Sequence, residues 1–269
     1  MSDIIIKNHW NEEIKNEWNE RSDEYYQKDM NDYPRIIENP ERAFPAAVYP
    51  LIKKYMGDLR GKKILVPSSG DNIAVFGFNL LGAKVTSCDI SENQLKNAKI
   101  LADKYNFNGI EFICQDSMKL DKIKDDEYDL VYTSNGVHVW IDDMPGMYKN
   151  FRRVLKDGGY NIFFETHPMC RPFDNTTYEV KIVKLYEDIE DPTDMTYAWR
   201  TQDFVNAAVS AGFKIKEMRE FHSVREDLNA HNYLDVADNQ NYNWSGDTFD
   251  WKINPWAALP QCLCMCSQK

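Results

Sequence analysis

The sequence lacks the features that mark several large classes of protein. No apolar run approaches the roughly 20 residues that a membrane helix needs. The N-terminal stretch MSDIIIKNHW has neither the basic segment nor the long apolar segment of a secretory signal. Acidic residues outnumber basic ones by 43 to 32, so the net charge is −11, and no Lys/Arg cluster occurs. Such a chain repels the phosphates of nucleic acids and anionic membranes. We therefore expect a soluble, cytoplasmic protein that binds neither nucleic acid nor membranes.

Metal-binding motifs are missing as well. The five histidines are scattered, and neither H-E-x-x-H nor C-x-x-C occurs, so we expect no metal. Without a secretory signal, the six cysteines are expected to be reduced thiols. Cys262, Cys264 and Cys266 alternate, which places them on one face of a strand. A buried face of small side chains is the favoured interpretation, and metal binding by these thiols is the alternative.

The strongest pattern is an alternation of predicted strands and helices that begins at Lys62. Apolar runs such as ILV, LVY and IFF indicate strands buried on both faces. The alternation predicts an α/β fold, with a parallel sheet and helices on both faces. The predicted strands are 62–67, 83–90, 110–116, 128–135, 160–166, 213–221 and 262–266, and the predicted helices between them are 72–82, 91–106, 144–159 and 201–213.

The remaining segments differ in character. Residues 1–60 carry a helical stripe of Ile6, Trp10, Ile14, Trp18 and Tyr25, then prolines that cut the chain into short pieces. A further helix is expected at 47–59, ending near Gly57. Residues 167–200 form a loop-rich insertion, and 225–255 are expected to be loop. We therefore expect one structural domain, with a helical segment at 1–60 and the main body at 61–269.

Polar residues follow the first three predicted strands. Ser68, Ser69 and Gly70 follow the first strand, Asp89 ends the second and Asp116 ends the third. Ligands of open parallel sheets bind beyond the carboxyl ends of the strands. A tight turn at a helix N-terminus lets backbone N–H groups approach a ligand. A carboxylate about 20 residues later can accept hydrogen bonds from ribose hydroxyls. With Asp116 near an adenine amino group, these residues predict an adenosine site.

Residues 62–165 resemble the class I S-adenosylmethionine-dependent methyltransferases. The pieces that carry the resemblance are KKILVPSSGDN, AKVTSCDISENQLKNAK, IEFICQDSMKL, YDLVYTSNGVHVW and FRRVLKDGGYNIFFE. The resemblance implies a Rossmann-like sheet of seven strands, mostly parallel, closed by an antiparallel hairpin of the last two strands. It implies S-adenosylmethionine as cofactor and S-adenosylhomocysteine as product. It also implies a helical lid at 1–60 and a substrate roof at 167–200.

The resemblance assigns cofactor contacts to residues in the N-terminal segment and after the first four strands. These are Arg21, Tyr26, Ser68, Ser69, Gly70, Asn72, Asp89, Ile90, Gln94, Gln115, Asp116, Ser117, Met118, Ser134, Asn135 and Gly136.

The glycine loop departs from the family pattern. Where the family carries G-x-G-x-G, this chain reads SSGDN and keeps only Gly70. The acidic residue common just before the loop is Val66 here. Serine is small, and Asn72 tolerates a positive φ better than most residues, so we expect the turn to keep its shape with different hydrogen bonds.

The same resemblance also implies which residues bind the methyl acceptor or act on it. His138 is a candidate general base, because histidine is the side chain best suited to exchange a proton near neutral pH. It can instead orient or pack, because proximity and alignment supply most of the catalysis of an in-line displacement. Trp140, His167, Arg171 and Trp199 are the candidate acceptor-binding residues.

The prediction is methyl transfer to a small-molecule acceptor by a monomer or homodimer. One alternative is a non-catalytic S-adenosylmethionine-binding module or partner subunit, which the variant loop suggests. The other is an NAD-dependent oxidoreductase, although G-x-G-x-x-G is absent.

Overall fold

The computed structural model describes residues 11–29, 32–70, 72–174, 180–190, 195–222, 250–253 and 255–269. Ile6 and Trp10 of the predicted helical stripe, and most of the loop expected at 225–255, lie outside these ranges. Among the described residues, no helix combines the length and apolar character needed to cross a membrane. The same part of the chain contains no group of three or more His, Cys, Asp or Glu side chains that could hold a metal ion.

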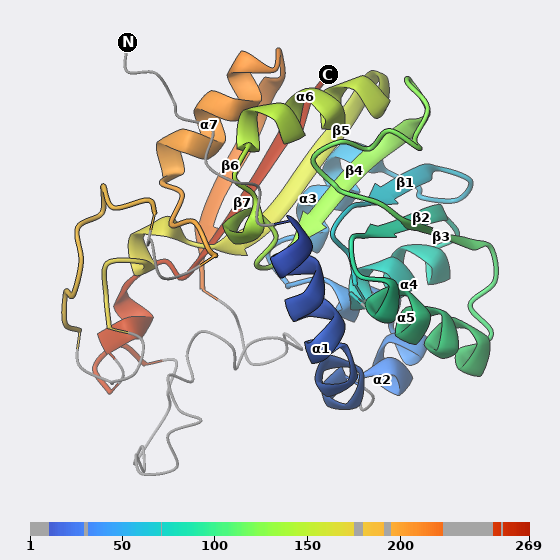
Figure 1. Ribbon diagram of the computed structural model, residues 1–269, viewed down its shortest axis with the longest axis horizontal. Coiled ribbons are helices and arrows are strands. Elements are labelled where there is room, and N and C mark those ends of the chain that lie inside the picture. The colour runs from blue at the N-terminus through green and yellow to red at the C-terminus, as the bar shows by residue number, and fades with distance from the viewer. Residues whose placement is uncertain are drawn as a thin grey trace.

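A seven-stranded sheet forms the centre of the molecule (Figure 1). Its strand order is β3-β2-β1-β4-β5-β7-β6. The first five strands run parallel, while β7 runs antiparallel to β5 and β6. The predicted Rossmann-like, mostly parallel sheet of seven strands is thus confirmed. The strands are β1 (Lys63–Val66), β2 (Lys84–Asp89), β3 (Ile110–Cys114), β4 (Tyr128–Ser134), β5 (Leu155–Thr166), β6 (Lys214–Phe221) and β7 (Cys262–Gln268).

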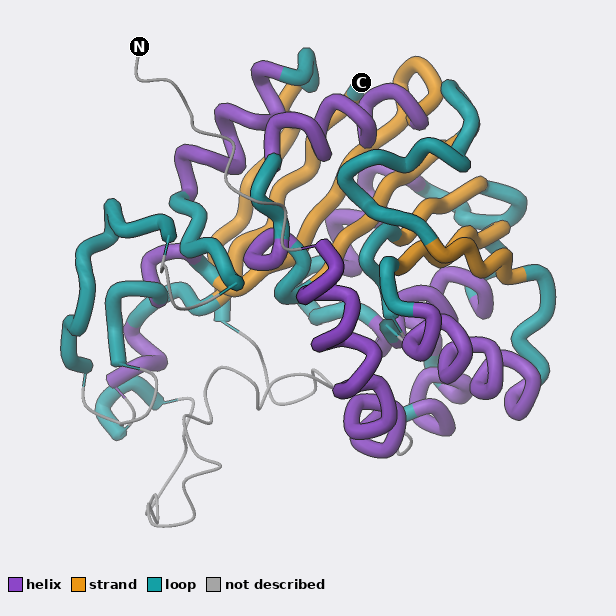
Figure 2. The backbone as a smooth tube through the Cα atoms, viewed as in Figure 1, coloured by secondary structure: helices purple, strands orange, loops and turns teal. Residues whose placement is uncertain are grey.

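Helices cover both faces of the sheet (Figure 2). Residues of α2 to α5 share one hydrophobic core with the sheet, and residues of α6 and α7 share the other. The helix α1 lies beside the carboxyl ends of the central strands (Figure 1). The α-helices are α1 (Asn11–Asp29), α2 (Tyr33–Glu38), α3 (Tyr49–Met56), α4 (Ile73–Leu80), α5 (Glu92–Tyr105), α6 (Met144–Val154) and α7 (Thr201–Ser210), and the 3-10 helices are η1 (Pro40–Ala43), η2 (His138–Trp140), η3 (Pro168–Cys170) and η4 (Pro255–Ala258).

The alternating cysteines behave as the one-face interpretation predicts. Cys262, Cys264 and Cys266 are buried in the core beneath α2 to α5, whereas Leu263 and Met265 face the other core. Burial raises the pKa of the Cys266 thiol to about 12. These thiols are therefore protonated at neutral pH and act as small apolar side chains.

The end of α6 differs from the prediction. The helix stops at Val154 rather than continuing to the glycines at 158–159. Leu155 already pairs with Tyr128 of β4, and the next paired positions are Tyr160 and Leu130. Residues 156–159 therefore bulge within the long strand β5. Ladder pairing with β4 outweighs the local helical pattern in this segment.

Other predicted boundaries agree with the structure. Helix α3 ends at Met56, and Gly57 follows it with a φ of 63°. Ser91 caps α5, where its side chain accepts the backbone N–H of Gln94. The described part of the insertion at 167–200 is mostly loop, with one short 3-10 helix and isolated bridges such as Phe173–Ile182.

The packing of α4 against η1 generates a prediction about Gly77. A Cβ added at Gly77 would overlap the Cβ of Ala43 and approach the Phe44 ring to 3.2 Å. Alanine favours a helix over glycine by about 1 kcal/mol, but overpacking costs about 1–3 kcal/mol. We expect Gly77→Ala to lower the free energy of unfolding, measured by urea denaturation. Adding Ala43→Gly should recover most of that loss. A more stable Gly77→Ala protein would contradict this close packing.

Candidate functional site

A pocket of about 440 Å³ lies over the carboxyl ends of β1 to β4. The strand order reverses between β1 and β4, which is where open α/β sheets bind ligands. Its size falls in the range of about 300–1,000 Å³ typical of small-molecule sites. Most of the predicted cofactor residues line it, namely Ser68, Ser69, Gly70, Asn72, Asp89, Ile90, Gln94, Asp116, Ser117, Met118, Ser134, Asn135 and Gly136.

The two serines that replace glycines anchor the loop after β1. The N–H and the hydroxyl of Ser68 both lie within hydrogen-bond distance of Ser117 Oγ, at 2.8 and 2.9 Å. The Ser69 hydroxyl lies 2.7 Å from Ser87 Oγ and donates to the carbonyl of Cys88 at 3.1 Å. The loop is therefore tied to β2 and to the segment after β3, in part through hydroxyl contacts that glycine could not make.

The backbone of this loop turns differently from the expectation. Positive φ angles occur at Ser68 (47°) and Gly70 (48°), whereas Asn72 has a φ of −49°. Asn72 instead caps α4, since its Oδ1 accepts the N–H of Ala74. Its Nδ2 donates to Ser134 Oγ at 2.6 Å, which joins the loops after β1 and β4.

Asp89 stands at the end of β2 with its carboxylate buried. Its Oδ2 accepts the N–H of Gly70 at 2.7 Å, and its Oδ1 accepts the N–H of Ser91 at 2.8 Å. Burial raises the pKa of Asp89 to about 6, although these N–H groups oppose the rise. At neutral pH the side chain is therefore mainly a carboxylate with further capacity to accept hydrogen bonds.

Gln94 supplies a buried acceptor beside Asp89. Its side-chain Oε1 is buried and has no hydrogen-bond partner in the described structure. A Cβ at Gly70 would lie 3.1 Å from this oxygen, so the missing side chain keeps the space open. Unpaired buried acceptors are costly, and a bound hydroxyl or amino group would satisfy this one. The observed donor and acceptor set fits a nucleoside.

Asp116 follows β3 and also lines the pocket. Its Oδ1 accepts the N–H of Met118 at 2.8 Å, and Asn11 of α1 donates to its Oδ2 at 3.2 Å. The Lys119 ammonium lies 3.3 Å from the same Oδ2.

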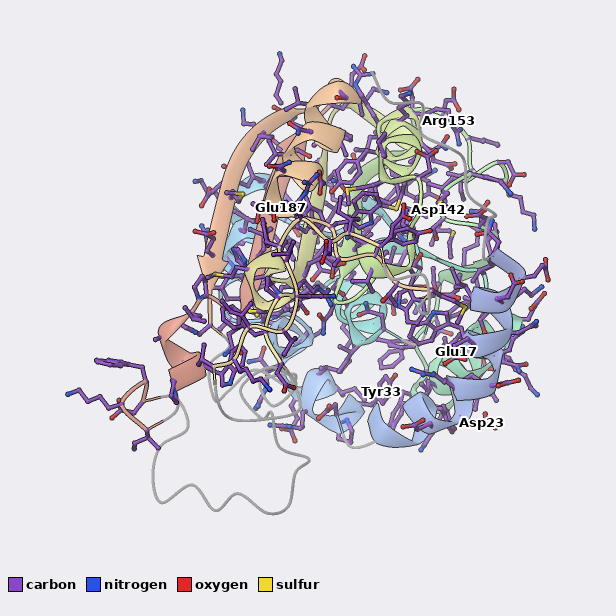
Figure 3. The ribbon with its side chains drawn as sticks, turned by 60° about the vertical axis from the view of Figure 1, so that its left-hand side comes forward. Glu17, Asp23, Tyr33, Asp142, Arg153 and Glu187 are labelled. Carbon is purple, nitrogen blue, oxygen red and sulfur yellow. The ribbon has the colours of Figure 1, made fainter. Side chains whose placement is uncertain are left out.

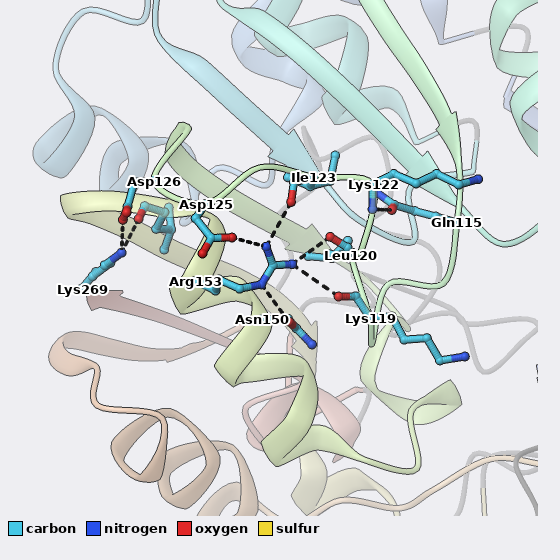
Figure 4. A network of polar contacts seen from close by, with 11 residues as sticks. Gln115, Lys119, Leu120, Lys122, Ile123, Asp125, Asp126, Asn150, Arg153 and Lys269 are labelled. Carbon is cyan, nitrogen blue, oxygen red and sulfur yellow. Dashed lines mark hydrogen bonds and ion pairs between the residues drawn. The ribbon is translucent and has the colours of Figure 1, made fainter.

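The segment after Asp116 is anchored by Arg153 of α6 (Figure 4). The guanidinium donates to the carbonyls of Leu120 and Ile123 at 2.8 and 3.0 Å. It also pairs with Asp125 at 2.5 Å. These bonds anchor the chain just beyond the lining residues Asp116, Ser117 and Met118.

Three predicted cofactor residues lie outside the pocket lining. Gln115 is buried, and its amide donates to the sulfur of Cys88. Arg21 is exposed on α1 and pairs at 2.5 Å with Glu17, which Figure 3 labels. Tyr26 packs against the core beneath α2 to α5. The residues of α1 that line the pocket are instead Asn11, Ile14 and Trp18.

His138 is placed as a structural residue. Its side chain is 1% exposed and does not line the pocket. Its Nδ1 lies 2.7 Å from Glu165 Oε1, and its Nε2 lies 3.2 Å from the Tyr148 hydroxyl. Because protein groups engage both ring nitrogens, the geometry does not support His138 as a general base and favours the alternative that it orients or packs.

Glu165 fixes the shape of the loop after β4. Its carboxylate accepts the backbone N–H groups of Gly136, Val137 and His138 at 2.8, 2.9 and 3.1 Å. Burial acts to raise its pKa, but the His138 ring and these N–H groups outweigh burial and bring the pKa below its usual range. Glu165 is therefore ionised. It holds the loop in which Asn135 adopts a φ of 44° at the pocket wall.

Of the four residues predicted to bind the methyl acceptor, only Trp140 lines the pocket. Its ring meets that of Trp18 edge to face, with centroids 5.3 Å apart. His167 is buried and pairs with Glu220 at 2.7 Å. Arg171 and Trp199 line a separate hollow of about 10 Å³, which is too small for an acceptor.

Several lining residues were not predicted as binding residues. Ile14 belongs to the predicted helical stripe, whose i, i+4 spacing is the signal that points to it and to Trp18. The others carried no such signal and come together only in the fold. They are Asn11, Asp32, Ala43, Pro45, Ile73, Tyr132, Val137, Val139, Ile141 and Phe164.

The Glu165 interactions generate a stability prediction. Glu165→Gln removes a buried charge that four donors surround, and such losses cost about 3–5 kcal/mol. We expect a fall of that size in the free energy of unfolding, measured by denaturant titration. Glu127→Gln is the control, because it breaks the part-exposed pair with Lys63 and should cost less than about 1 kcal/mol. Equal, small effects would show that Glu165 does not organise the loop.

Comparison with known proteins supports the same fold and domain. Residues 67–163 match the family described as Methyltransferase domain. Over 181 residues the chain is 28% identical to a sterol 24-C-methyltransferase of Gibberella zeae. The aligned part is 66% of this chain and 46% of that protein, so the chain spans about half the length of this curated relative.

Solved structures share the architecture at low sequence identity. An S-adenosylmethionine-dependent methyltransferase from Mesorhizobium loti is 19% identical, with a TM-score of 0.60, covering 83% of this chain and 98% of that chain. A methyltransferase from Aquifex aeolicus is 12% identical, with a TM-score of 0.53, covering 88% and 97%. The cyclase SpnF also shares the fold, at 16% identity and a TM-score of 0.58, covering 83% and 80%. Residues 67–163 thus match a methyltransferase domain, and the chain shares its fold with S-adenosylmethionine-dependent methyltransferases.

Proposed function

We propose that this protein transfers a methyl group from S-adenosylmethionine to a small-molecule acceptor. The observation that carries the proposal is the group formed by Gly70, Asp89 and Gln94, which presents buried acceptors at the switch point of the sheet. The net charge of −11 disfavours nucleic acid as the acceptor. The cytoplasmic location and the monomeric or dimeric state remain predictions.

We propose an orientation for the bound cofactor from the residues that line the pocket. Asp89 and Gln94 would accept from the ribose hydroxyls, and Asp116 would accept from the adenine amino group. The loop at Ser68 to Gly70 would lie against the amino-acid end. When bound, S-adenosylmethionine supplies a methyl group on a sulfonium sulfur, which is already activated for displacement.

The other end of the pocket excludes water rather than offering a base. Val139, Trp140, Ile141 and Phe164 line it, and no described lining residue is a histidine. Burial raises the pKa of Tyr132 well above its usual range, so its phenol stays neutral. We propose that α1 acts as a lid there and that the site works by holding the acceptor in line, which is sufficient for such displacements.

The two alternatives make different predictions about binding. The first alternative is a non-catalytic module whose variant loop has lost part of its function. The hydroxyls of Ser68 and Ser69 still tie this loop to Ser117 and to β2, which favours a working cofactor site. NAD would also offer ribose hydroxyls to Asp89. Calorimetric titration with S-adenosylhomocysteine, S-adenosylmethionine and NAD separates these cases. We expect micromolar binding of the first two and none of NAD, whereas preferential NAD binding would overturn the proposal.

Asp89→Ala tests the ribose contact. Loss of charge-assisted hydrogen bonds should weaken S-adenosylhomocysteine binding by about 1.5–3 kcal/mol, or roughly one to two orders of magnitude. Arg21→Ala is the control, because Arg21 lies outside the pocket lining and should leave the affinity unchanged. Unaltered affinity in a folded Asp89→Ala protein would remove Asp89 from this role.

The raised pKa of Asp89 predicts a pH dependence. Its pKa is about 6 in the fold, against an unfolded value of about 3.9. Only the carboxylate accepts from both ribose hydroxyls, so the affinity for S-adenosylhomocysteine should rise with pH through about 6 and then level off. The contribution of Asp89 to the stability of the unliganded protein has the opposite sign. The folded protein binds a proton on Asp89 more tightly than the unfolded chain does. The stability that this proton contributes is therefore lost as pH rises from about 4 to 6.

Calorimetry across this pH range, with Asp89→Asn alongside, checks the prediction. The variant should show a flat profile through pH 6. A wild-type profile as flat as that of the variant would show that Asp89 does not titrate at the ligand.

A further inference from the structure

We propose that the acceptor is a largely apolar molecule without negative charge, such as an alcohol, a phenol or an amine. The part of the pocket left to the methyl acceptor then rejects carboxylates and phosphates, while the cofactor's own carboxylate would lie against the loop at Ser68 to Gly70. This inference rests on the proposed function and names the substrate class of the same site.

The charged side chains that line the pocket all have one sign. Among the described residues, the lining contains Asp32, Asp89 and Asp116 but no Lys, Arg or His. Tyr132 adds only a neutral phenol, because burial raises its pKa far above neutrality. An anion entering this space meets negative charge and finds no cationic side chain in that lining.

Two cations pair with the lining carboxylates but do not cancel the negative charge. Arg35 pairs with Asp32 at 3.2 Å, and Lys119 pairs with Asp116 at 3.3 Å. Their side chains are 48% and 64% exposed, and neither lines the pocket. Cations this exposed are strongly screened by solvent and salt, so they offset the buried negative charge only in part.

The backbone donors that usually hold anions are already engaged. The three successive N–H groups of Gly136, Val137 and His138 point at the carboxylate of Glu165. The N–H of Gly70 points at Asp89. Successive N–H groups of this kind form anion-binding concavities in other proteins. Here a protein carboxylate occupies that position, so it is closed to an anionic acceptor.

Apolar surface completes the end of the pocket over β4 and β5. Val139, Trp140, Ile141 and Phe164 line it, and Trp18 of α1 meets Trp140 edge to face. Such a surface favours an aromatic or aliphatic body. The indole rings also tolerate an ammonium group through cation–π attraction. Neutral and cationic acceptors therefore meet a favourable surface, while anions lose hydration without compensation.

A matched series of ligands tests the charge preference. Tryptophol, tryptamine and indole-3-acetate share one ring system and are respectively neutral, cationic and anionic. The first measurement is ligand-observed NMR of each compound on the protein saturated with S-adenosylhomocysteine. It is extended to a fragment library with equal shares of the three charges. We expect the anions to bind at least about tenfold more weakly, which corresponds to 1.4 kcal/mol.

Val139→Arg places a cation in the lining and should bring anionic fragments into the pocket. Val139→Gln is its control, since it adds length and polarity without charge and should leave the anions excluded. Anions that bind the wild type as well as the neutral compounds do would overturn the inference. A library in which no fragment of any charge binds would also overturn it.

The failure of this inference is distinguishable from failure of the proposed function. If S-adenosylhomocysteine does not bind, the methyltransferase proposal falls. The charge preference can then still be measured on the unliganded protein with the same library.

Discussion

Two carboxylates buried at the carboxyl edge of the sheet, and held there by backbone N–H groups, determine the geometry of the pocket. Asp89 joins the loop after β1 to the start of α5, and Glu165 holds the loop after β4. A buried carboxylate is tolerated only when donors surround it. The loops that approach the ligand are therefore shaped by the need to satisfy these two charges.

This constraint also decides what the pocket can recognise. The carboxylates engage the available N–H donors, so the surface left to a ligand is rich in acceptors at one end and apolar at the other. The acceptor-rich end suits the hydroxyl and amino groups of a nucleoside. The serines in place of glycines serve the same arrangement, because their hydroxyls tie the loop to β2 and to Ser117, while Gly70 leaves the space beside Gln94 open.

Periodicity and strand-end position predicted the sheet and the strand-end loops that line the pocket, since both depend on local sequence. The end of α6 was wrong because pairing of Leu155 with β4 is a long-range effect. His138 was misplaced for a related reason, as its partner Glu165 comes from another strand. The position of α1 over the sheet, which brings Asn11 to Asp116 and leaves Arg21 outside, depends on tertiary packing that no local pattern reveals.

A crystal structure of the protein with S-adenosylhomocysteine is the most direct test of the central claim, that this acceptor-rich pocket is the cofactor site. We expect ribose hydroxyls on Asp89, a hydrogen bond to the side-chain oxygen of Gln94 and the adenine amino group near Asp116. The loops held by Asp89 and Glu165 should keep the conformation described above. A nucleoside bound elsewhere, or bound here without contact to Asp89 and Gln94, would contradict it.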